Sequence, residues 1–303
     1  MKILVTGCCG YIASQLIRDL PKAFPRAKIT ISDIRFDPKV LGNLKKGVYT
    51  FVKCDLTKNE EVWNLVRQEA EWDYLFHLGA LVEAENSPSR AEEVWATNFE
   101  GTKRLLSLGK FKKIIFPSTA NVYGHNKKEG LSEEDMIQPV FPYACAKKAC
   151  EDYIISSSKP AVILRLSTNF GVSPAMRNNL VINYFMERII CGEDLTVHGD
   201  GKNWRPFIHV KDTCRMMIAA AKYGKIGYIY NIGAFNAQIG HLAEDIATFS
   251  DRSPIKNVKY LKDINVPFSY NIDFSKSRRL RTQPSITLAA GINELLKYYK
   301  GFI

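Results

Sequence analysis

Residues 2–13 read KILVTGCCGYIA, an apolar run followed by a turn with a glycine at each end. The run predicts a buried strand over 2–6, and the amphipathic stretch after Gly10 predicts a helix over 11–20. Because glycine has no Cβ, the backbone N–H groups of such a turn can approach a pyrophosphate at the N-terminus of the following helix. Ala13 is small enough to let that helix pack closely on the strand. The spacing Gly-x-x-Gly-x-x-Ala differs from the Gly-x-Gly-x-x-Gly of many dinucleotide sites, and glycine turns also arise without a ligand.

The rest of the first half alternates short apolar runs with amphipathic stretches, as a parallel sheet with crossover helices requires. Further strands are predicted at 28–33, 49–53, 74–77, 113–117 and 161–166, and further helices at 58–70, 90–108 and 143–158. The fold class is therefore α/β, a Rossmann-type doubly wound parallel sheet. The ligand crevice of such a sheet lies at the carboxyl ends of its strands.

After about residue 167 the alternation gives way to loops rich in Asn, Gly and Pro, with helices predicted near 178–191, 211–223, 240–249 and 286–299. We expect residues 1–167 to form a dinucleotide-binding domain. Residues 168–303 are expected to form mainly a smaller C-terminal substrate-binding cap, with segments near 206–232 returning to the first domain.

The chain of 303 residues has 42 Lys and Arg against 31 Asp and Glu, a net charge of +11. This excess favours anionic partners such as nucleotides, phosphates or nucleic acid, or it reflects a lysine-rich solvated surface. No basic tract is interleaved with aromatic residues, so nucleic acid is not the expected partner.

Seven cysteines are scattered along the chain without CxxC pairs or a histidine cluster at metal-ligand spacing, so no metal site is expected. They are interpreted as reduced thiols, and Cys8 and Cys9 as structural residues of a tight turn. The first predicted strand begins at residue 2, which leaves no room for a signal peptide, and no apolar run reaches membrane-spanning length. We expect a soluble cytoplasmic protein with no membrane partner.

A second motif, Tyr143-Ala-Cys-Ala-Lys147, follows the strand that leads into Ser118 and Thr119. Residues four apart share one face of a helix. A tyrosine with a pKa near ~10 is a poor base, but a lysine ammonium at ~4 Å, worth about 4 kcal/mol, can lower that pKa to about 7. Tyr143 is the expected proton acceptor, Lys147 the group that activates it, and Thr119 the group that orients the reacting hydroxyl. The alternative is that Thr119 caps a strand end and Tyr143 packs as an aromatic.

Asp33 ends the second predicted strand, about twenty residues beyond the glycine turn, where a carboxylate accepts hydrogen bonds from an adenosine ribose. This position favours NAD over NADP, because a 2′-phosphate beside Asp33 would meet a like charge. NADP remains an alternative cofactor, because the Arg35 side chain can turn toward such a phosphate. Asp55 and Leu56 close the third strand and are placed to contact the edge and face of the adenine. Residues 77–80 close the fourth strand and are expected to border the pyrophosphate and the ribose.

The chain also carries an ordered set of motifs: Asn98-x-x-Gly-Thr, Pro117-Ser-Thr-Ala-Asn-Val-Tyr-Gly124, Arg165-x-x-x-Asn169-x-Gly171, Asn178-Asn179-Leu180 and Gly199-Asp-Gly-x-x-x-Arg205-Pro-Phe-Ile-His-Val210. With this set the chain resembles, over nearly its whole length, the extended short-chain dehydrogenase/reductases that act on nucleotide sugars. These form the NAD-dependent epimerase/dehydratase family. The resemblance implies NAD as the cofactor, and it gives Thr119, Tyr143 and Lys147 as the catalytic set.

The resemblance and the strand-end positions together assign binding roles. The residues expected to bind NAD are Gly7, Gly10, Tyr11, Ile12, Asp33, Asp55, Leu56, Leu78, Gly79, Ala80, Asn98, Ser118, Tyr143 and Lys147. Those expected to bind a nucleotide-diphosphate sugar, with a UDP-sugar preferred, are Thr119, Asn121, Tyr143, Asn169, Asn179, Leu180 and Arg205. One departure is Lys262, which replaces an arginine that many relatives use to clamp the diphosphate. An ammonium binds phosphate as a point charge, whereas a guanidinium binds it bidentately.

By this resemblance we expect an NAD-dependent nucleotide-sugar 4-epimerase that oxidises C4 transiently and returns the hydride to the opposite face. Dehydratases of the family typically carry acids directly after the Thr, whereas Ala120 and Asn121 stand there in this chain. One alternative is a 4-reductase or 4-dehydrogenase that releases its cofactor at each turnover. Another is a non-catalytic dinucleotide-sensing or RNA-binding scaffold.

The resemblance also implies a homodimer in which the helices at 90–108 and 143–158 pair across a two-fold axis. The apolar positions expected to supply the contact are Val94, Leu105, Cys150 and Ile154.

Overall fold

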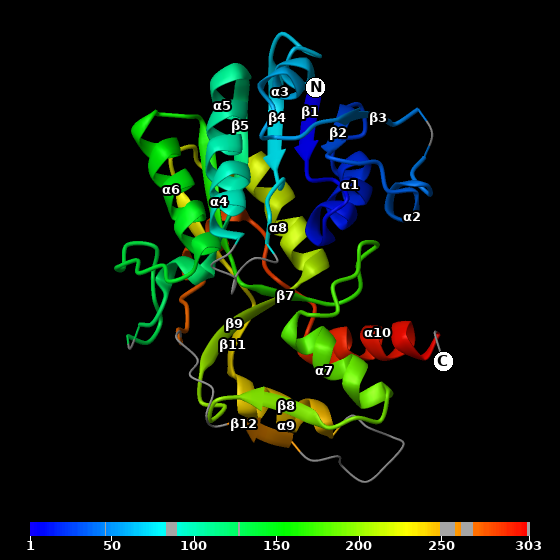
Figure 1. Ribbon diagram of the computed structural model, residues 1–303, viewed down its shortest axis with the longest axis vertical. Helices are drawn as coiled ribbons and strands as arrows, with labels where there is room; N and C mark the ends of the chain where they lie inside the picture. The colour runs from blue at the N-terminus through cyan, green and yellow to red at the C-terminus, as the bar shows by residue number, and fades with distance from the viewer. Residues whose placement is uncertain (46, 83–89, 127, 249–257, 262–268, 302–303) are drawn as a thin grey trace.

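The computed structural model describes residues 1–45, 47–82, 90–126, 128–248, 258–261 and 269–301. Its main feature is a seven-stranded parallel sheet in the order β10-β6-β5-β4-β1-β2-β3 (Figure 1). The strands are β1 Lys2–Thr6, β2 Lys28–Asp33, β3 Tyr49–Lys53, β4 Trp72–His77, β5 Phe111–Thr119, β6 Ala161–Leu166 and β10 Ile229–Ile232. The predicted doubly wound sheet is confirmed, and β4 and β5 are longer than the apolar runs that predicted them.

Strand β1, next to the middle strand β4, is buried on both faces, as the continuous apolar run of a covered parallel strand requires. It pairs with β2 on one side and β4 on the other, so the chain order reverses here and opens a crevice at the carboxyl ends. Gly7 leaves β1 with φ +71°, and a Cβ on it would lie 2.7 Å from the backbone of Leu78 and Gly79. Only glycine allows the turn after β1 to pack this closely on the loop after β4.

Helices cover both faces of the sheet. On one face α1 (Tyr11–Ala23) and α8 (Val210–Tyr223) pack against each other and against Ile3 and Val5. On the other face α3 (Asn59–Val66), α5 (Gly101–Leu108) and α6 (Pro142–Ser156) bury Leu4 and Leu75. The short helix α2 (Pro38–Leu41) follows β2. The stretch predicted as one helix over 90–108 consists of α4 (Ala91–Val94), a π-helical turn (Trp95–Glu100) and α5.

The second half of the chain builds a smaller layer at the carboxyl edge of the sheet (Figure 1). β7 (Thr168–Phe170), β9 (Trp204–His209) and β11 (Phe235–Gln238) form a three-stranded sheet, and β8 (Leu195–His198) pairs with β12 (Val258–Leu261). A separate apolar core joins them to α7 (Val181–Ile190), α9 (Ile239–Ala247) and α10 (Leu288–Lys300). Of the segment 206–232, α8 and β10 join the large sheet, whereas β9 stays with β7 and β11.

The smaller layer is tied to the start of α1. The Tyr11 hydroxyl donates to the carbonyl of Gly171 at 2.6 Å, and the Gly171 N–H donates to Asn183 Oδ1 at 2.9 Å. Gly171 has φ +100°, and a Cβ on it would lie 2.1 Å from His209 Nε2. These contacts fix the loop after β7 beside the glycine turn.

The apolar residues expected to supply a dimer contact are not on the surface. Val94, Leu105, Cys150 and Ile154 are at most 2 % exposed and pack inside the chain. This part of the prediction is wrong, because these side chains point from their helices toward the chain's own core. The exposed large apolar side chains of the same helices are Trp95, Leu108 and Ile155.

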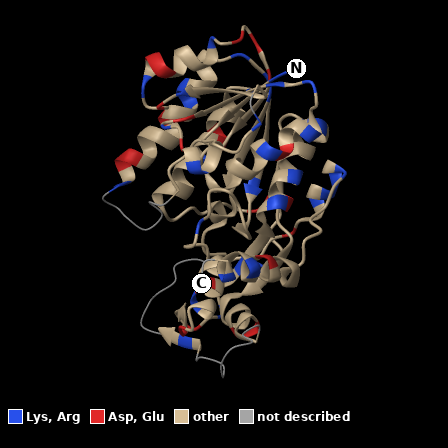
Figure 2. Cartoon of the chain, turned by 90° about the vertical axis from the view of Figure 1, so that its right-hand side faces the viewer, with Lys and Arg blue, Asp and Glu red and all other residues tan. Residues whose placement is uncertain are grey.

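Charged residues are spread widely over the molecule. Figure 2 shows Lys and Arg along helices of both layers, with Asp and Glu interspersed among them. Among the described residues, no helix combines the length and apolar character needed to cross a membrane.

Candidate active site

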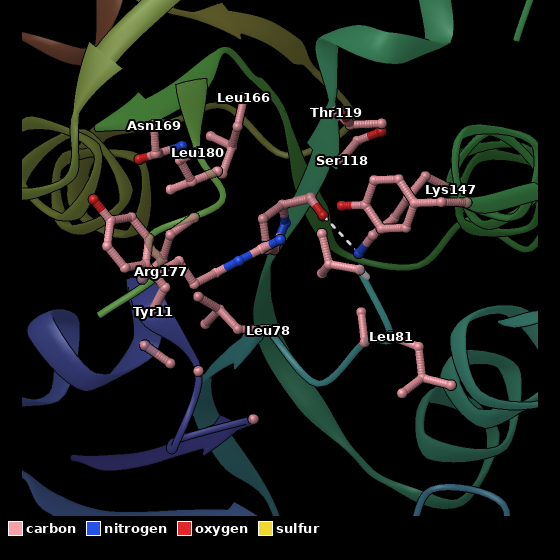
Figure 3. Close-up of a pocket in the computed structure, with 18 of the residues that line it drawn as sticks. Tyr11, Leu78, Leu81, Ser118, Thr119, Lys147, Leu166, Asn169, Arg177 and Leu180 are labelled. Atoms are coloured by element: carbon pink, nitrogen blue, oxygen red, sulfur yellow. Dashed lines mark hydrogen bonds between the residues drawn. The ribbon is translucent and has the colours of Figure 1, made fainter. Parts of the chain in front are cut away.

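A pocket of about 360 Å³ lies at the carboxyl ends of β1, β4, β5 and β6, within the roughly 300–1,000 Å³ range of ligand sites. Figure 3 shows Thr119 and Lys147 on one side and Tyr11 and Arg177 on the other. Of the residues predicted to bind cofactor or substrate, the pocket brings together Gly7, Gly10, Tyr11, Ile12, Leu78, Ala80, Ser118, Thr119, Tyr143, Lys147, Asn169 and Leu180.

The glycine turn forms the end of the pocket beside α1. Gly10 caps this helix and offers no side-chain acceptor, so no capping side chain satisfies the N–H groups of the first turn. Gly10 N itself donates back to the Gly7 carbonyl at 2.9 Å, which closes the turn. Free N–H groups at the positive end of a helix dipole suit an anion, so these residues fit a dinucleotide pyrophosphate.

Asp33 ends β2 behind this turn and is not part of the pocket lining. Its two carboxylate oxygens each accept one backbone N–H, from Cys9 at 2.9 Å and from Ile34 at 2.8 Å. Burial raises the pKa of Asp33 above its ordinary value, while these hydrogen bonds act to lower it. Arg35, the residue that could bind the 2′-phosphate of NADP, is exposed.

Three predicted cofactor residues near β3 and β4 also lie outside the lining. The Asp55 carboxylate accepts from the N–H and the hydroxyl of Thr57, so it stabilises a local turn. Leu56 packs closely on Gly79, where an added Cβ would lie 2.9 Å from Leu56 Cδ1. Gly79 N donates to Thr6 Oγ1 at 3.1 Å.

Asn98 is buried in the π-helical turn and supports the pocket from outside it. Its side-chain oxygen accepts from Leu81 N at 2.7 Å, and its side-chain nitrogen donates to the Leu81 carbonyl at 2.9 Å. Leu81 lines the pocket. Asn98 therefore fixes the loop after β4 that borders the site.

The three residues of the predicted catalytic set line the same end of the pocket. Thr119 ends β5, and Tyr143 follows Pro142, which occupies the first position of α6 where its missing N–H costs nothing. Lys147 lies one turn further along α6 and donates from Nζ to the Pro117 carbonyl at 2.9 Å (Figure 3). Tyr143 and Thr119 are each 8 % exposed, so water has little access to this end.

Burial controls the charge of Lys147. The ammonium is enclosed by protein and lies 4.7 Å from the centre of the Phe116 ring. Burial lowers the pKa of Lys147 to about 8, although Cys150 and Glu151 act to raise it. A lysine with this pKa can gain or lose a proton near neutral pH.

A buried ion pair, missed by the sequence analysis, lies behind the catalytic end. Glu151 and Arg165 are 1–2 % exposed and pair at 2.9 Å, and Ser118 Oγ donates to the same carboxylate. Arg165 Nη1 also donates to the Tyr123 hydroxyl at 2.9 Å. The available signal was an acid four residues after Lys147, which places Glu151 on the same face of α6. Ser118 thus lines the pocket, and its hydroxyl is bound to the Glu151 carboxylate.

The residues expected to bind substrate divide into two groups. Asn169 and Leu180 line the pocket, and the Asn169 amide is held by the Ser167 carbonyl at 3.0 Å and the Thr213 hydroxyl at 2.6 Å. Asn121, Asn179 and Arg205 lie outside the lining. Asn121 Oδ1 accepts from the Tyr270 hydroxyl, and Asn179 Oδ1 accepts from Arg177 Nε. The Arg205 guanidinium lies 5.4 Å from the centre of the Tyr270 ring. Lys262 is outside the described residues.

Two pocket arginines were also missed by the sequence analysis. Arg90 precedes α4, and Arg177 precedes Asn179 in the loop before α7. The signal for Arg177 was a cation two residues before a predicted diphosphate ligand. With Lys147 they give the pocket three cationic residues, and the described lining includes no Asp or Glu. The pocket therefore suits anionic ligands.

The sheet order, the glycine turn and the Tyr143–Lys147 pair together define an extended short-chain dehydrogenase/reductase. The chain belongs to the NAD dependent epimerase/dehydratase family, whose model matches residues 3–233. NAD is the cofactor of this family.

Similar proteins include enzymes of two activities. The chain is 30 % identical to the low-salt glycan biosynthesis protein Agl12 of Haloferax volcanii, over 99 % of both chains, and 29 % identical to human dTDP-D-glucose 4,6-dehydratase, over 99 % of this chain and 90 % of the human one. Among solved structures it is 27 % identical to UDP-N-acetylglucosamine 4-epimerase from Methanobrevibacter ruminantium, with a TM-score of 0.87 over 100 % and 99 % of the two chains. UDP-glucuronic acid 4-epimerase from Bacillus cereus, solved with UDP-glucuronic acid and NAD, is also 27 % identical, with a TM-score of 0.84 over both full chains. The chain is thus an enzyme of the nucleotide-sugar epimerase/dehydratase superfamily.

Proposed function

We propose that the protein is an NAD-dependent nucleotide-sugar 4-epimerase. The observation that carries this proposal is the chemistry of the reacting end of the pocket. Thr119, Tyr143 and Lys147 supply a hydroxyl, a phenol and an amine there, and the described lining has no carboxylate. This set suffices for oxidation and reduction at one carbon.

A 4,6-dehydratase needs further proton transfers, because it removes a proton from C5 and delivers one to the C6 hydroxyl. The positions after Thr119 that carry acids in typical dehydratases are Ala120 and Asn121. Neither side chain titrates near neutral pH. Asn121 also accepts a hydrogen bond from the Tyr270 hydroxyl, which holds its amide. The named dehydratases among the relatives favour the other activity, but these two positions argue against it.

Binding of the dinucleotide falls to the glycine turn and the end of β2. The first-turn N–H groups of α1 would hold the pyrophosphate, and Asp33 would accept hydrogen bonds from the adenosine ribose. Tyr143 and Lys147 would border the nicotinamide ribose. NAD supplies the acceptor, and later the donor, of the hydride at C4 of the sugar.

Proton transfer falls to Tyr143. Its phenol would take the proton of the C4 hydroxyl while the hydride leaves, and return it when the hydride comes back. The Lys147 ammonium favours the phenolate electrostatically, and the enclosed site strengthens this interaction. Thr119 would hold the C4 oxygen in position by a hydrogen bond.

The substrate would be anchored through its diphosphate. A 4-epimerase must let the hexose turn over while the nucleotide stays in place. Arg177, on the side of the pocket opposite Thr119 (Figure 3), and the neighbouring Asn179 would supply cationic and amide groups for a UDP-sugar diphosphate. Arg90 adds a further cation to the pocket lining. Arg205, on β9, would contribute from the cap.

A substrate panel tests the proposal against the alternative of a 4-reductase or 4-dehydrogenase. The purified protein would be incubated with UDP-, GDP-, dTDP-, CDP- and ADP-sugars, and mass spectrometry would identify the bound nucleotide. We expect bound NAD and turnover without added cofactor. Stoichiometric consumption of free NAD or NADPH would instead indicate the reductase or dehydrogenase, and no turnover with any sugar would favour a non-catalytic scaffold.

A further inference from the structure

Three metal-ligating side chains meet beside the glycine turn. Cys8 Sγ, Cys9 Sγ and a carboxylate oxygen of Asp33 all lie within 4.8 Å of one another. Within the described part of the chain, this is the only group of three or more Cys, His, Asp or Glu ligand atoms at such distances. Sequence spacing predicted no metal site, because the ligands come from adjacent cysteines in one turn and from the end of another strand.

The separations are close to those that a tetrahedral thiophilic ion requires. With Zn–S bonds of about 2.3 Å and Zn–O bonds of about 2.1 Å, two sulfurs around one ion lie about 3.8 Å apart. The three ligand atoms lie within 4.8 Å of one another, a range that includes this separation. Two thiolates and one carboxylate suit Zn²⁺ and its heavier congener Cd²⁺ far better than Mg²⁺ or Ca²⁺.

Backbone hydrogen bonds already hold the three residues in place. Cys8 N donates to the Ser32 carbonyl at 3.1 Å, and Cys9 N donates to Asp33 Oδ2 at 2.9 Å. Ile34 N donates to Asp33 Oδ1 at 2.8 Å, so the carboxylate is oriented and each oxygen keeps a lone pair. Cys8 is fully buried, whereas Cys9 and Asp33 are partly exposed. An ion would enter from the side of Cys9 and Asp33, and it would displace the weak Cys9 Sγ–H bond to the Arg35 carbonyl.

We propose that Cys8, Cys9 and Asp33 bind one Zn²⁺-class thiophilic cation, and that this ion and the dinucleotide exclude each other. Binding replaces the two thiol protons, which pass to solvent, and leaves the fourth coordination position to water. The exclusion rests on the proposed function, because Asp33 is the residue assigned to the adenosine ribose. A soft metal would therefore prevent cofactor loading without touching Tyr143.

Cadmium titration of the full chain, freed of bound dinucleotide, tests the proposal. The ultraviolet charge-transfer band of a Cd²⁺–thiolate bond reports binding directly. We expect saturation at one equivalent and at least a tenfold loss of affinity in Cys9→Ser. Cys191→Ser removes an exposed cysteine outside the group and is the matched control, with affinity unchanged. Excess NAD should weaken Cd²⁺ binding in proportion to its concentration.

An unchanged band in Cys9→Ser would overturn the site, and Cd²⁺ binding that is indifferent to NAD would overturn the exclusion. If Cys9→Ser does not fold, Asp33→Asn provides a second variant that should also lose Cd²⁺ affinity, and circular dichroism establishes the folded state of each protein. The absorption band does not depend on turnover. Cadmium binding without epimerisation would leave the metal site standing and contradict the proposed function. Epimerisation without cadmium binding would contradict the metal site alone.

Discussion

At the scale of single residues, the proposal depends on Tyr143 acting as the base. We predict that Tyr143→Phe keeps the fold and NAD binding but lowers kcat at least about 100-fold, because the variant has no proton acceptor at C4. Tyr153→Phe is the matched control, since Tyr153 lies on the same helix and its hydroxyl bonds Ser107 outside the pocket. Steady-state kinetics with near-normal turnover in Tyr143→Phe would remove this residue from the mechanism.

Lys147 gives a prediction about stability and pH. Burial lowers its pKa to about 8 in the folded chain, against 10.5 for an ordinary lysine. Between these values the unfolded chain binds more protons than the folded one, so stability rises with pH. Relative to Lys147→Met, the wild type should gain roughly 3 kcal/mol between pH 8 and 10.5.

Urea unfolding at several pH values measures this difference, because contributions from other groups cancel between the two proteins. Lys148→Met is the control, since its partly exposed ammonium pairs with Asp152 on the surface of α6. A difference between wild type and Lys147→Met that stays constant from pH 8 to 10.5 would contradict a low pKa for Lys147.

At the scale of secondary-structure elements, periodicity predicted most of the fold. The predicted limits of the buried strands β1, β2 and β6 agree with the structure. β1 and β6 are nearly continuous apolar runs, and β2 alternates Ile29 and Ile31 with Thr30 and Ser32. The direction of helix side chains was harder to predict. The helices around α5 and α6 have several apolar positions, and only the packed chain shows that Val94 and Cys150 face inward while Ile155 faces out.

Contacts between distant segments could not be predicted from the sequence either, because they too depend on how the chain packs. Arg165 on β6 and Glu151 on α6 pair because β5 and β6 are neighbours and α6 lies across them, which no local spacing encodes. Likewise Arg177 enters the pocket because the loop after β7 is tied to Tyr11. The glycine turn and the Tyr143–Lys147 pair were predictable because each is a short local pattern.

The buried Glu151–Arg165 pair gives a prediction for these elements. Glu151→Gln leaves the Arg165 guanidinium buried without its counter-charge, which should cost about 3–5 kcal/mol in the free energy of unfolding. Glu151→Gln/Arg165→Met should recover part of this loss. Urea denaturation measures both, with Glu60→Gln on the exposed side of α3 as the control that changes stability by less than about 0.5 kcal/mol. A loss that small in Glu151→Gln would show that the pair does not stabilise the α6–β6 packing.

At the scale of the whole molecule, we predict a homodimer formed by the helices around α5 and α6. The exposed side chains Trp95, Leu108 and Ile155 would supply the apolar contact in place of the buried residues suggested by the sequence. Light scattering at micromolar concentration should give twice the chain mass of 34.3 kDa, and Ile155→Glu should weaken the dimer. Ile226→Glu, which changes an exposed apolar residue elsewhere, is the control. A strictly monomeric wild type would rule this assembly out.

The identity of the reaction also belongs to the whole molecule, because it depends on the sheet, the cap and the cofactor together. Family membership does not decide between an epimerase and a dehydratase activity. Proteins with similar sequence identity to this chain include enzymes of both names. The absence of a carboxylate from the described pocket lining, with Ala120 and Asn121 after Thr119, favours the epimerase.

Proton NMR of the product tests this central claim most directly. The protein would be incubated in turn with UDP-glucose, UDP-N-acetylglucosamine and dTDP-glucose, without added NADH. We predict that at least one of them is converted to a mixture of C4 stereoisomers with the C6 hydroxymethyl group intact and no net NADH. A new C6 methyl signal with loss of the C6 hydroxymethyl protons would identify a 4,6-dehydratase and contradict the account.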